Sequence, residues 1–330
     1  MREKQEALEK ATPQLDITEE VLKLVVPGHT IGEATGVAKN SQGHLFVFTR
    51  SGSTGIALGS TASQLFEFDQ NLKFIKEWGP DNYAASFAHT VRVDKDDNVY
   101  MTDEGSNMVV KFNPDGTVAM VLGRKPEAID WLQSHVQRGE KDEERYTEGR
   151  MGTFNRPTDV AVDAADGDIF VSDGYNNSRV AKIDKNGNWI KSVGSHGSGP
   201  LQFSTPHGIA IDAKGIVYVA DRGNRRVQVF DNDLNHLRNI ETVAAPWTAC
   251  ISPGETQYLF TGDGTGKIYK TDLEGNLLGW AQTSMNHGQT GCLIHTLHCE
   301  SATVLYKGDC STWTVEKITI NGGGVSDGAR

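Results

Sequence analysis

Long apolar segments and basic clusters are both missing from this 330-residue sequence. No apolar run approaches the roughly 20 residues that a bilayer-spanning helix needs. Lys and Arg number 32 against 43 Asp and Glu, and the formal net charge of −11 argues against a nucleic-acid backbone as partner. The first 26 residues are charged throughout and lack the apolar core of a secretory signal. We therefore expect a cytoplasmic protein that binds neither membranes nor nucleic acid.

Cysteine is also scarce. Four cysteines occur, all in the last third of the chain: Cys250, Cys292, Cys299 and Cys310. None forms a CxxC pair, and their spacing resembles no zinc ribbon. In a cytosolic protein such cysteines are expected to be reduced, buried thiols. We assign them no functional role.

Glycine, by contrast, is abundant, with 36 residues, and it accompanies a sixfold internal repeat. The second copy contains four short strand patterns separated by turns: TVRVD, VYMTD, MVVKFN and TVAMVLG. Repeats of about 40 to 50 residues with several short strands each are typical of β-propellers. The sequence therefore predicts an all-β, six-bladed propeller whose first strands line a central channel.

The predicted propeller spans residues 29–322. Residues 1–28 form an N-terminal extension with helical periodicity, expected to pack outside the ring. Residues 126–150 are a polar insertion between the second and third copies, placed at one rim, and residues 323–330 are expected to be a flexible tail.

One position of the repeat carries histidine in alternate copies. In the three copies with histidine, this histidine position lies fourteen residues before the aspartate that ends the second predicted strand. Its occupants, in chain order, are Thr35, His89, Thr158, His207, Trp247 and His295. In a closed ring the three histidines would lie about 120° apart around one axis, the arrangement of a three-histidine site for zinc or another divalent transition metal. The alternative is three channel-lining histidines bonded to water.

The aspartates that end these strands have a simpler interpretation. Segments such as YVADRGNRRVQVF resemble NHL repeats, in which the aspartate and asparagine brace the turn between the second and third strands. We expect Asp103, Asp173, Asp221 and Asp309 to be structural in the same way.

Three further candidates follow predicted second strands, whose loops all lie over one rim. Arg50 and Arg222 come one residue after the aspartate-equivalent position, and Tyr175 comes two residues after Asp173. Arginine can bind a carboxylate through two hydrogen bonds. A tyrosine beside a metal and two arginines would have a lowered pKa and could act as a base. The alternatives are blade-to-blade salt bridges for the arginines and an amphipathic rim residue for the tyrosine.

Residues 30–320 resemble the peptidyl-α-hydroxyglycine α-amidating lyases, on the segments FNRPTDVAVDAADGDIFVSDGYNNSRV, GPLQFSTPHGIAID and VYVADRGNRRVQVF. The resemblance implies a six-bladed propeller with zinc bound by His89, His207 and His295. It also implies that Tyr175 is the catalytic tyrosine and that Arg50 and Arg222 are the active-site arginines. The implied reaction cleaves the C–N bond of an α-hydroxyglycine carbinolamide to give an amide and glyoxylate.

The same resemblance implies a structural calcium in the channel. Its ligands would be the backbone carbonyls of Val37 and Val91 and an aspartate after the last histidine, but that residue is Thr296 in this sequence. Secreted members have a cysteine after the tyrosine, where Asn176 stands, and no copper monooxygenase domain is present in the sequence. These departures favour a small-molecule or peptide substrate with a carboxylate over a peptide hormone.

Two other functions remain open at this point. Six-bladed propellers also include metal-dependent lactonases and esterases, so the same site could hydrolyse an ester. A non-enzymatic NHL scaffold that binds a partner on its rim is the third possibility.

Overall fold

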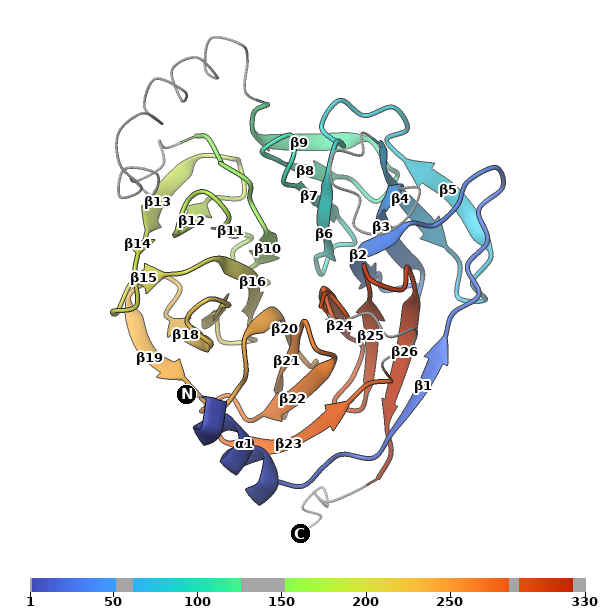
Figure 1. The fold of residues 1–330 in the computed structure, drawn as a ribbon. Helices are drawn as coiled ribbons and strands as arrows, with labels where there is room; N and C mark the ends of the chain where they lie inside the picture. Colours follow the sequence, from blue (N-terminus) through green and yellow to red (C-terminus); the bar gives the residue numbers. More distant parts are fainter. Residues whose placement is uncertain (1, 52–61, 126–151, 285–290, 323–330) are drawn as a thin grey trace.

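Six four-stranded antiparallel sheets surround a common axis in the computed structural model, which describes residues 2–51, 62–125, 152–284 and 291–322 (Figure 1). Blades 1 to 3 consist of β2 (Glu33–Lys39), β3 (Leu45–Ser51), β4 (Ala62–Phe68) and β5 (Phe74–Trp78); β6 (Ala88–Val93), β7 (Val99–Asp103), β8 (Met108–Phe112) and β9 (Val118–Gly123); and β10 (Asp159–Val162), β11 (Ile169–Asp173), β12 (Arg179–Ile183) and β13 (Trp189–Val193).

Blades 4 to 6 complete the ring. Their strands are β16 (Pro206–Ile211), β17 (Val217–Asp221), β18 (Arg226–Phe230) and β19 (His236–Ile240); β20 (Pro246–Ile251), β21 (Leu259–Asp263), β22 (Lys267–Thr271) and β23 (Leu277–Gln282); and β24 (Thr296–Cys299), β25 (Val304–Gly308), β26 (Val315–Ile320) and β1 (Ile17–Val21). A two-residue parallel pair, β14 (Ser195–His196) and β15 (Gln202–Phe203), precedes blade 4. The predicted all-β, six-bladed propeller is confirmed.

The N-terminal segment differs from the prediction. Residues Arg2–Ala11 form helix α1, as expected, but Ile17–Val21 pair antiparallel with β26 as the outer strand of blade 6. The helical periodicity over residues 17–25 was therefore misleading, because pairing with the last strand overrides local preference. The first and last parts of the chain thus share one sheet and close the ring (Figure 1).

The apolar core lies between neighbouring blades. One cluster joins Phe46 and Trp78 of blade 1 to Met101 and Phe112 of blade 2, and equivalent clusters occur at each of the other five blade boundaries. A single four-stranded sheet cannot bury both of its faces, so each blade depends on its two neighbours. This packing fixes the angular positions of the inner strands.

The repeat aspartates brace turns, as expected. Asp103 accepts hydrogen bonds from the backbone N–H groups of Phe87 (2.7 Å) and Ser106 (2.7 Å). Asp221 accepts from the N–H of Ser204 (2.8 Å) and pairs with Arg226. Each carboxylate thus ties the loop before the inner strand to the turn after the second strand. The predicted insertion at 126–150 and tail at 323–330 lie outside the described residues.

The prediction of reduced cysteines was wrong. Cys250 is bonded to Cys299, which links β20 to β24, and Cys292 is bonded to Cys310. The Cα atoms are 5.8 and 5.6 Å apart, distances that a disulfide requires and that residue spacing along the chain does not reveal. Disulfides persist mainly in oxidising compartments, so these two weigh against the cytoplasmic expectation, which stays a prediction. No helix within the described part of the chain is long and apolar enough to span a membrane.

Candidate metal centre

The histidine position is a β-bulge in the inner strands of four blades. Thr35, His89, His207 and Trp247 are each skipped in the pairing of the first strand with the second. A bulge leaves one residue unpaired and changes the direction of its side chain, and bulges are common beside active sites. The residue pattern does not indicate this irregularity, because the strand patterns on either side continue through it.

The three histidines converge on the axis, as predicted. The ligand atoms of His89, His207 and His295 all lie within 4.8 Å of one another, and all three residues are buried. Their ring centroids are 4.6 to 5.1 Å apart. Three imidazoles with an open further position are the donor set of many catalytic zinc sites, so these residues could hold such an ion.

The blades without histidine orient the histidines of the others. In each histidine, Nδ1 lies at hydrogen-bond distance from a backbone carbonyl, which leaves Nε2 free for a metal. The acceptor is always the residue at the histidine position of the next blade: Thr158 for His89, Trp247 for His207 (2.6 Å) and Thr35 for His295 (2.8 Å). These carbonyls fix the tautomer and the ring orientation before any metal binds.

Burial keeps the three imidazoles neutral, the form that binds a metal. Desolvation lowers the pKa of His89 and of His207 well below the usual value. The two neighbouring histidines and then Arg50 lower the pKa of His89 further, and Arg222 and then His295 lower that of His207. The pKa of His295 falls to about 3, chiefly through burial and then through Arg50. All three nitrogens would therefore be available as ligands at neutral pH.

Tyr175 faces the same nitrogen atoms. Its hydroxyl lies 3.0 Å from Nε2 of His207 and 3.3 Å from Nε2 of His89. The expected lowering of its pKa does not occur in the protein alone: burial raises the Tyr175 pKa, and Glu104 raises it further, while Arg222 and Arg50 oppose both. A bound dication would lower the pKa of Tyr175, as the arginines do.

The two predicted arginines reach the site but differ in their contacts. Arg50 is buried, donates from Nε to the backbone carbonyl of Ala88 (2.6 Å) and lies 3.5 Å from Glu33, so it partly serves as a link between blades. Arg222 stacks on the ring of Trp247 (4.4 Å) and lies over that of Tyr175 (5.4 Å). Within the described part of the chain Arg222 has no carboxylate partner, which makes it the better candidate for binding a substrate carboxylate.

A carboxylate at the site was missed by the sequence analysis. Glu104 is buried, and its Oε2 lies 3.7 Å from Nε2 of His89. Its other oxygen, Oε1, accepts a hydrogen bond from Arg156 (2.9 Å), whose guanidinium also lies over the Tyr175 ring (4.6 Å). Glu104 follows Asp103 directly, so it has the same place in the repeat as Arg222. The arginines were selected because they follow the aspartate-equivalent position. The same criterion selects Glu104 when acidic residues are included.

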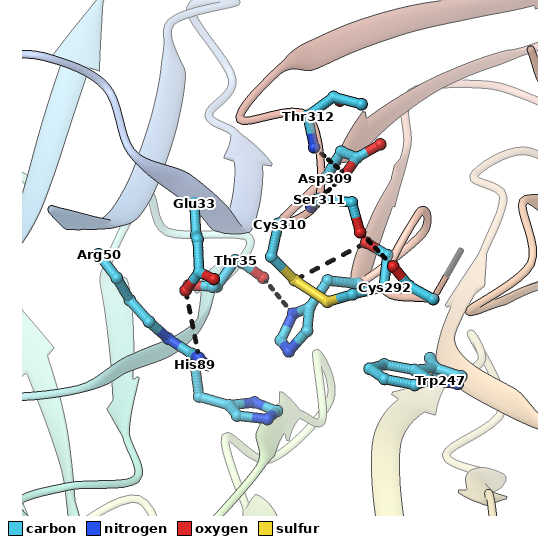
Figure 2. The surroundings of a disulfide bond; sticks show 12 residues. Glu33, Thr35, Arg50, His89, Trp247, Cys292, Asp309, Cys310, Ser311 and Thr312 are labelled. Atoms are coloured by element: carbon cyan, nitrogen blue, oxygen red, sulfur yellow. Dashed lines mark hydrogen bonds and ion pairs between the residues drawn. A yellow bond between two sulfur atoms is a disulfide. The ribbon is translucent and has the colours of Figure 1, made fainter. Parts of the chain in front are cut away.

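The disulfide between Cys292 and Cys310 lies at the edge of the site. Cys310 follows Asp309, whose carboxylate accepts hydrogen bonds from the backbone of Ser311 (2.6 Å) and Thr312 (2.9 Å) (Figure 2). The two sulfur atoms and a ring nitrogen of His295 lie within 4.8 Å of one another. The disulfide therefore joins the segment that leads into His295 to the braced turn after β25.

The channel does not fit the implied calcium. Among the described residues, the hydroxyl of Thr296 is buried without a hydrogen-bond partner, but it supplies no negative charge. Arg92, next to Val91, binds Asp159 through Nε (2.9 Å) and Nη2 (2.6 Å) and the carbonyl of Leu297 through Nη1 (2.8 Å). A guanidinium fixed beside Val91 repels a dication. We assign calcium no role.

Comparisons with known proteins agree with this architecture. A sequence model of the NHL repeat matches residues 154–183 and 203–230. The chain is 30% identical over 252 residues to a Caenorhabditis elegans protein described as a probable peptidyl-alpha-hydroxyglycine alpha-amidating lyase, covering 71% of this chain and 66% of the relative. The chain belongs to this amidating-lyase family of NHL-repeat propellers.

Other relatives of the family set limits on what membership implies. The chain is 30% identical over 222 residues to NHL repeat-containing protein 3 of Mus musculus, covering 62% of this chain and 54% of that protein. It therefore spans less than two thirds of the length of these curated relatives. Among solved structures, virginiamycin B lyase from Staphylococcus aureus superposes with a TM-score of 0.59 over 93% of this chain and 100% of that one, at 12% identity, which supports the fold alone.

Proposed function

We propose that the protein is a metal-dependent lyase that cleaves the C–N bond of an α-hydroxyglycine-type carbinolamide, giving an amide and glyoxylate. The observation that carries the proposal is the ring of three histidines whose Nε2 atoms converge, each held by a backbone carbonyl of the next blade. The hydroxyl of Tyr175 faces two of these atoms. Zinc is the ion that this donor set suits best.

The metal and Tyr175 would have different roles in the reaction. When bound, zinc supplies Lewis-acid chemistry, lowering the pKa of a coordinated hydroxyl. Tyr175 takes the proton from the α-hydroxyl as the C–N bond breaks and returns a proton to the departing amide nitrogen. Because burial raises the pKa of Tyr175, this role depends on the positive charge of Arg50, Arg222 and the metal.

Substrate binding would rest on Arg222. Its guanidinium is held over two aromatic rings and has no carboxylate partner within the described residues, so both of its terminal nitrogens can bind the substrate carboxylate. Arg50 is held by Ala88 and Glu33 and contributes positive charge near the reacting oxygen. A substrate with a carboxylate next to the carbinol carbon fits both arginines.

A binding scaffold without catalysis is a second candidate, because a relative at 30% identity has a name that describes no enzyme. A scaffold has no use for three converging imidazoles with oriented tautomers. It predicts a folded protein that binds no metal.

The test is release of glyoxylate from α-hydroxyhippurate by zinc-loaded protein, with and without a chelator. We expect release that the chelator abolishes. Tyr175→Phe should keep the zinc content of the wild type and lower turnover at least about 100-fold, the size of a general acid–base contribution. Zinc binding without glyoxylate release would refute the lyase reaction and favour hydrolysis of a lactone or an ester. A folded protein without zinc would refute the metal site itself.

A further inference from the structure

Glu104 carries a buried oxygen atom that no protein group satisfies. Its side chain is 3% exposed, and Oε2 has no hydrogen-bond partner among the described residues. A buried carboxylate oxygen without a partner is costly, so native proteins rarely leave one unless a ligand or ion completes its contacts. The unpartnered oxygen therefore indicates that a ligand or an ion binds beside Glu104.

The direction of Oε2 shows where its missing partner would bind. Arg156 holds Oε1 at 2.9 Å, and this contact leaves the second oxygen beside the histidine ring, 3.7 Å from Nε2 of His89. Two atoms that bind one transition metal at about 2.0 to 2.2 Å lie no more than roughly 4.4 Å apart, so this separation allows both to contact the same ion. Nε2 of His89 is the atom that would bind the metal, because Nδ1 faces the carbonyl of Thr158.

The charges around the histidines favour an anion beside the metal. Three neutral imidazoles bring no negative charge. The guanidinium groups of Arg50, Arg156 and Arg222 lie around Tyr175 and the three histidines. A dication placed among them would be strongly repelled in a poorly solvated site. Glu104 supplies negative charge in contact with a ligand histidine, and it can offset part of this repulsion.

We propose that Glu104 is a fourth protein ligand of the cation, so that the site binds its metal through three imidazoles and one carboxylate. The proposal rests on the metal site of the proposed function and adds a ligand to it. A donor set of three nitrogens and one carboxylate oxygen suits zinc, iron, cobalt and manganese, and a metal with five or six ligands keeps positions for substrate.

The test uses Glu104→Gln, which keeps the shape of the side chain and removes its charge. We expect zinc affinity, measured by competition with a chromophoric chelator, to fall at least about 10-fold, because a charged ligand is replaced by a neutral amide and even the loss of a group that supports a ligand costs that much. The visible spectrum of the cobalt-loaded protein should change as well, because a ligand is lost or exchanged. Glu67→Gln is the matched control: Glu67 is equally buried, binds His44 and Trp78 away from the site, and should leave affinity and spectrum unaltered.

A cobalt spectrum identical to that of the wild type would overturn the proposal. If Glu104→Gln does not fold, the double variant Glu104→Ala with Arg156→Ala removes both partners of the ion pair and is measured in the same way. Failure of the proposed function looks different, since the folded wild type would then either bind no zinc or bind zinc without releasing glyoxylate. Retention of the wild-type affinity and spectrum in the Glu104 variant, with loss of binding in His207→Ala, would refute the added ligand alone.

Discussion

Even-numbered and odd-numbered blades contribute to the centre in different ways. Blades 2, 4 and 6 provide the imidazole side chains, and blades 1, 3 and 5 provide the backbone carbonyls that orient them. Only histidine supplies an imidazole, whereas a backbone carbonyl is available from any residue. This explains why the even blades repeat one residue type at the histidine position while the odd blades have two threonines and a tryptophan.

The same comparison explains the alternation. A ring of six histidines would give more imidazoles than a tetrahedral zinc ion can bind, and each would need an acceptor for Nδ1. With histidine in every second blade, each imidazole has a carbonyl from its neighbour and the metal has three imidazole ligands. At the histidine position, we expect substitutions in the even blades to act on the metal and substitutions in the odd blades to act on substrate binding or stability.

The largest effect should come from removing an even-blade histidine. His207→Ala deletes one of three imidazoles, so zinc affinity should fall more than about 100-fold, beyond the losses that follow removal of supporting groups. Bound zinc after gel filtration, measured by elemental analysis, checks this. His298→Ala is the control, because His298 lies three residues after His295 but off the histidine position. Full zinc occupancy in the His207 variant would refute the site.

A smaller effect should appear in the pH dependence of the metal-free protein. The pKa of His295 is about 3 in the folded state and about 6.5 when unfolded, so the unfolded chain binds the extra proton below pH 6.5. Stability should be constant above that pH and decline as the pH falls toward 3, by up to about 1.4 kcal/mol per pH unit for this histidine.

Denaturant unfolding at several pH values measures this decline. Other groups also titrate in the range, including His298, whose burial lowers its pKa to about 4. The contribution of His295 is therefore obtained as the difference between the wild type and His295→Gln, whose side chain does not titrate. Equal slopes for the two proteins would contradict a neutral, buried imidazole.

The smallest effect on the metal should come from an odd blade. Trp247→Ala keeps the backbone carbonyl that holds His207, so zinc affinity should change less than about 3-fold. The stacking of Arg222 on the indole ring is lost, and the KM for α-hydroxyhippurate should rise about 2- to 5-fold, the size of an exposed cation–π contact. A large loss of zinc in this variant would show that the side chain, and not the carbonyl, supports the histidine.

Much of the architecture could be predicted from the sequence. The repeat gave the six blades, and the common spacing to the aspartate selected His89, His207 and His295. The place of Arg222 and Tyr175 after second strands, and of Arg50 near the end of β3, brought them to one rim. These inferences succeeded because a propeller repeats one local structure, so equal positions in the sequence become equivalent positions around the axis.

Other features depended on contacts between distant residues. The sequence misled us at Ile17–Val21, whose partner strand is almost 300 residues away, at the cysteines, and at Tyr175, whose pKa is raised by burial and by a carboxylate from another blade. Each depends on contacts between separate segments, and residue spacing along the chain does not show which segments meet.

The period of the repeat is enough to predict how many blades form, which three imidazoles meet and which loops cover them. The orientation of the imidazoles depends on folding, because the bulges and the carbonyls of neighbouring blades come into place when the ring closes. The contact of Glu104 with His89 depends on folding as well, since packing beside Arg156 turns one carboxylate oxygen toward the imidazole. Orientation and charge at the centre are properties of pairs of blades, and a pair of blades exists only in the folded protein.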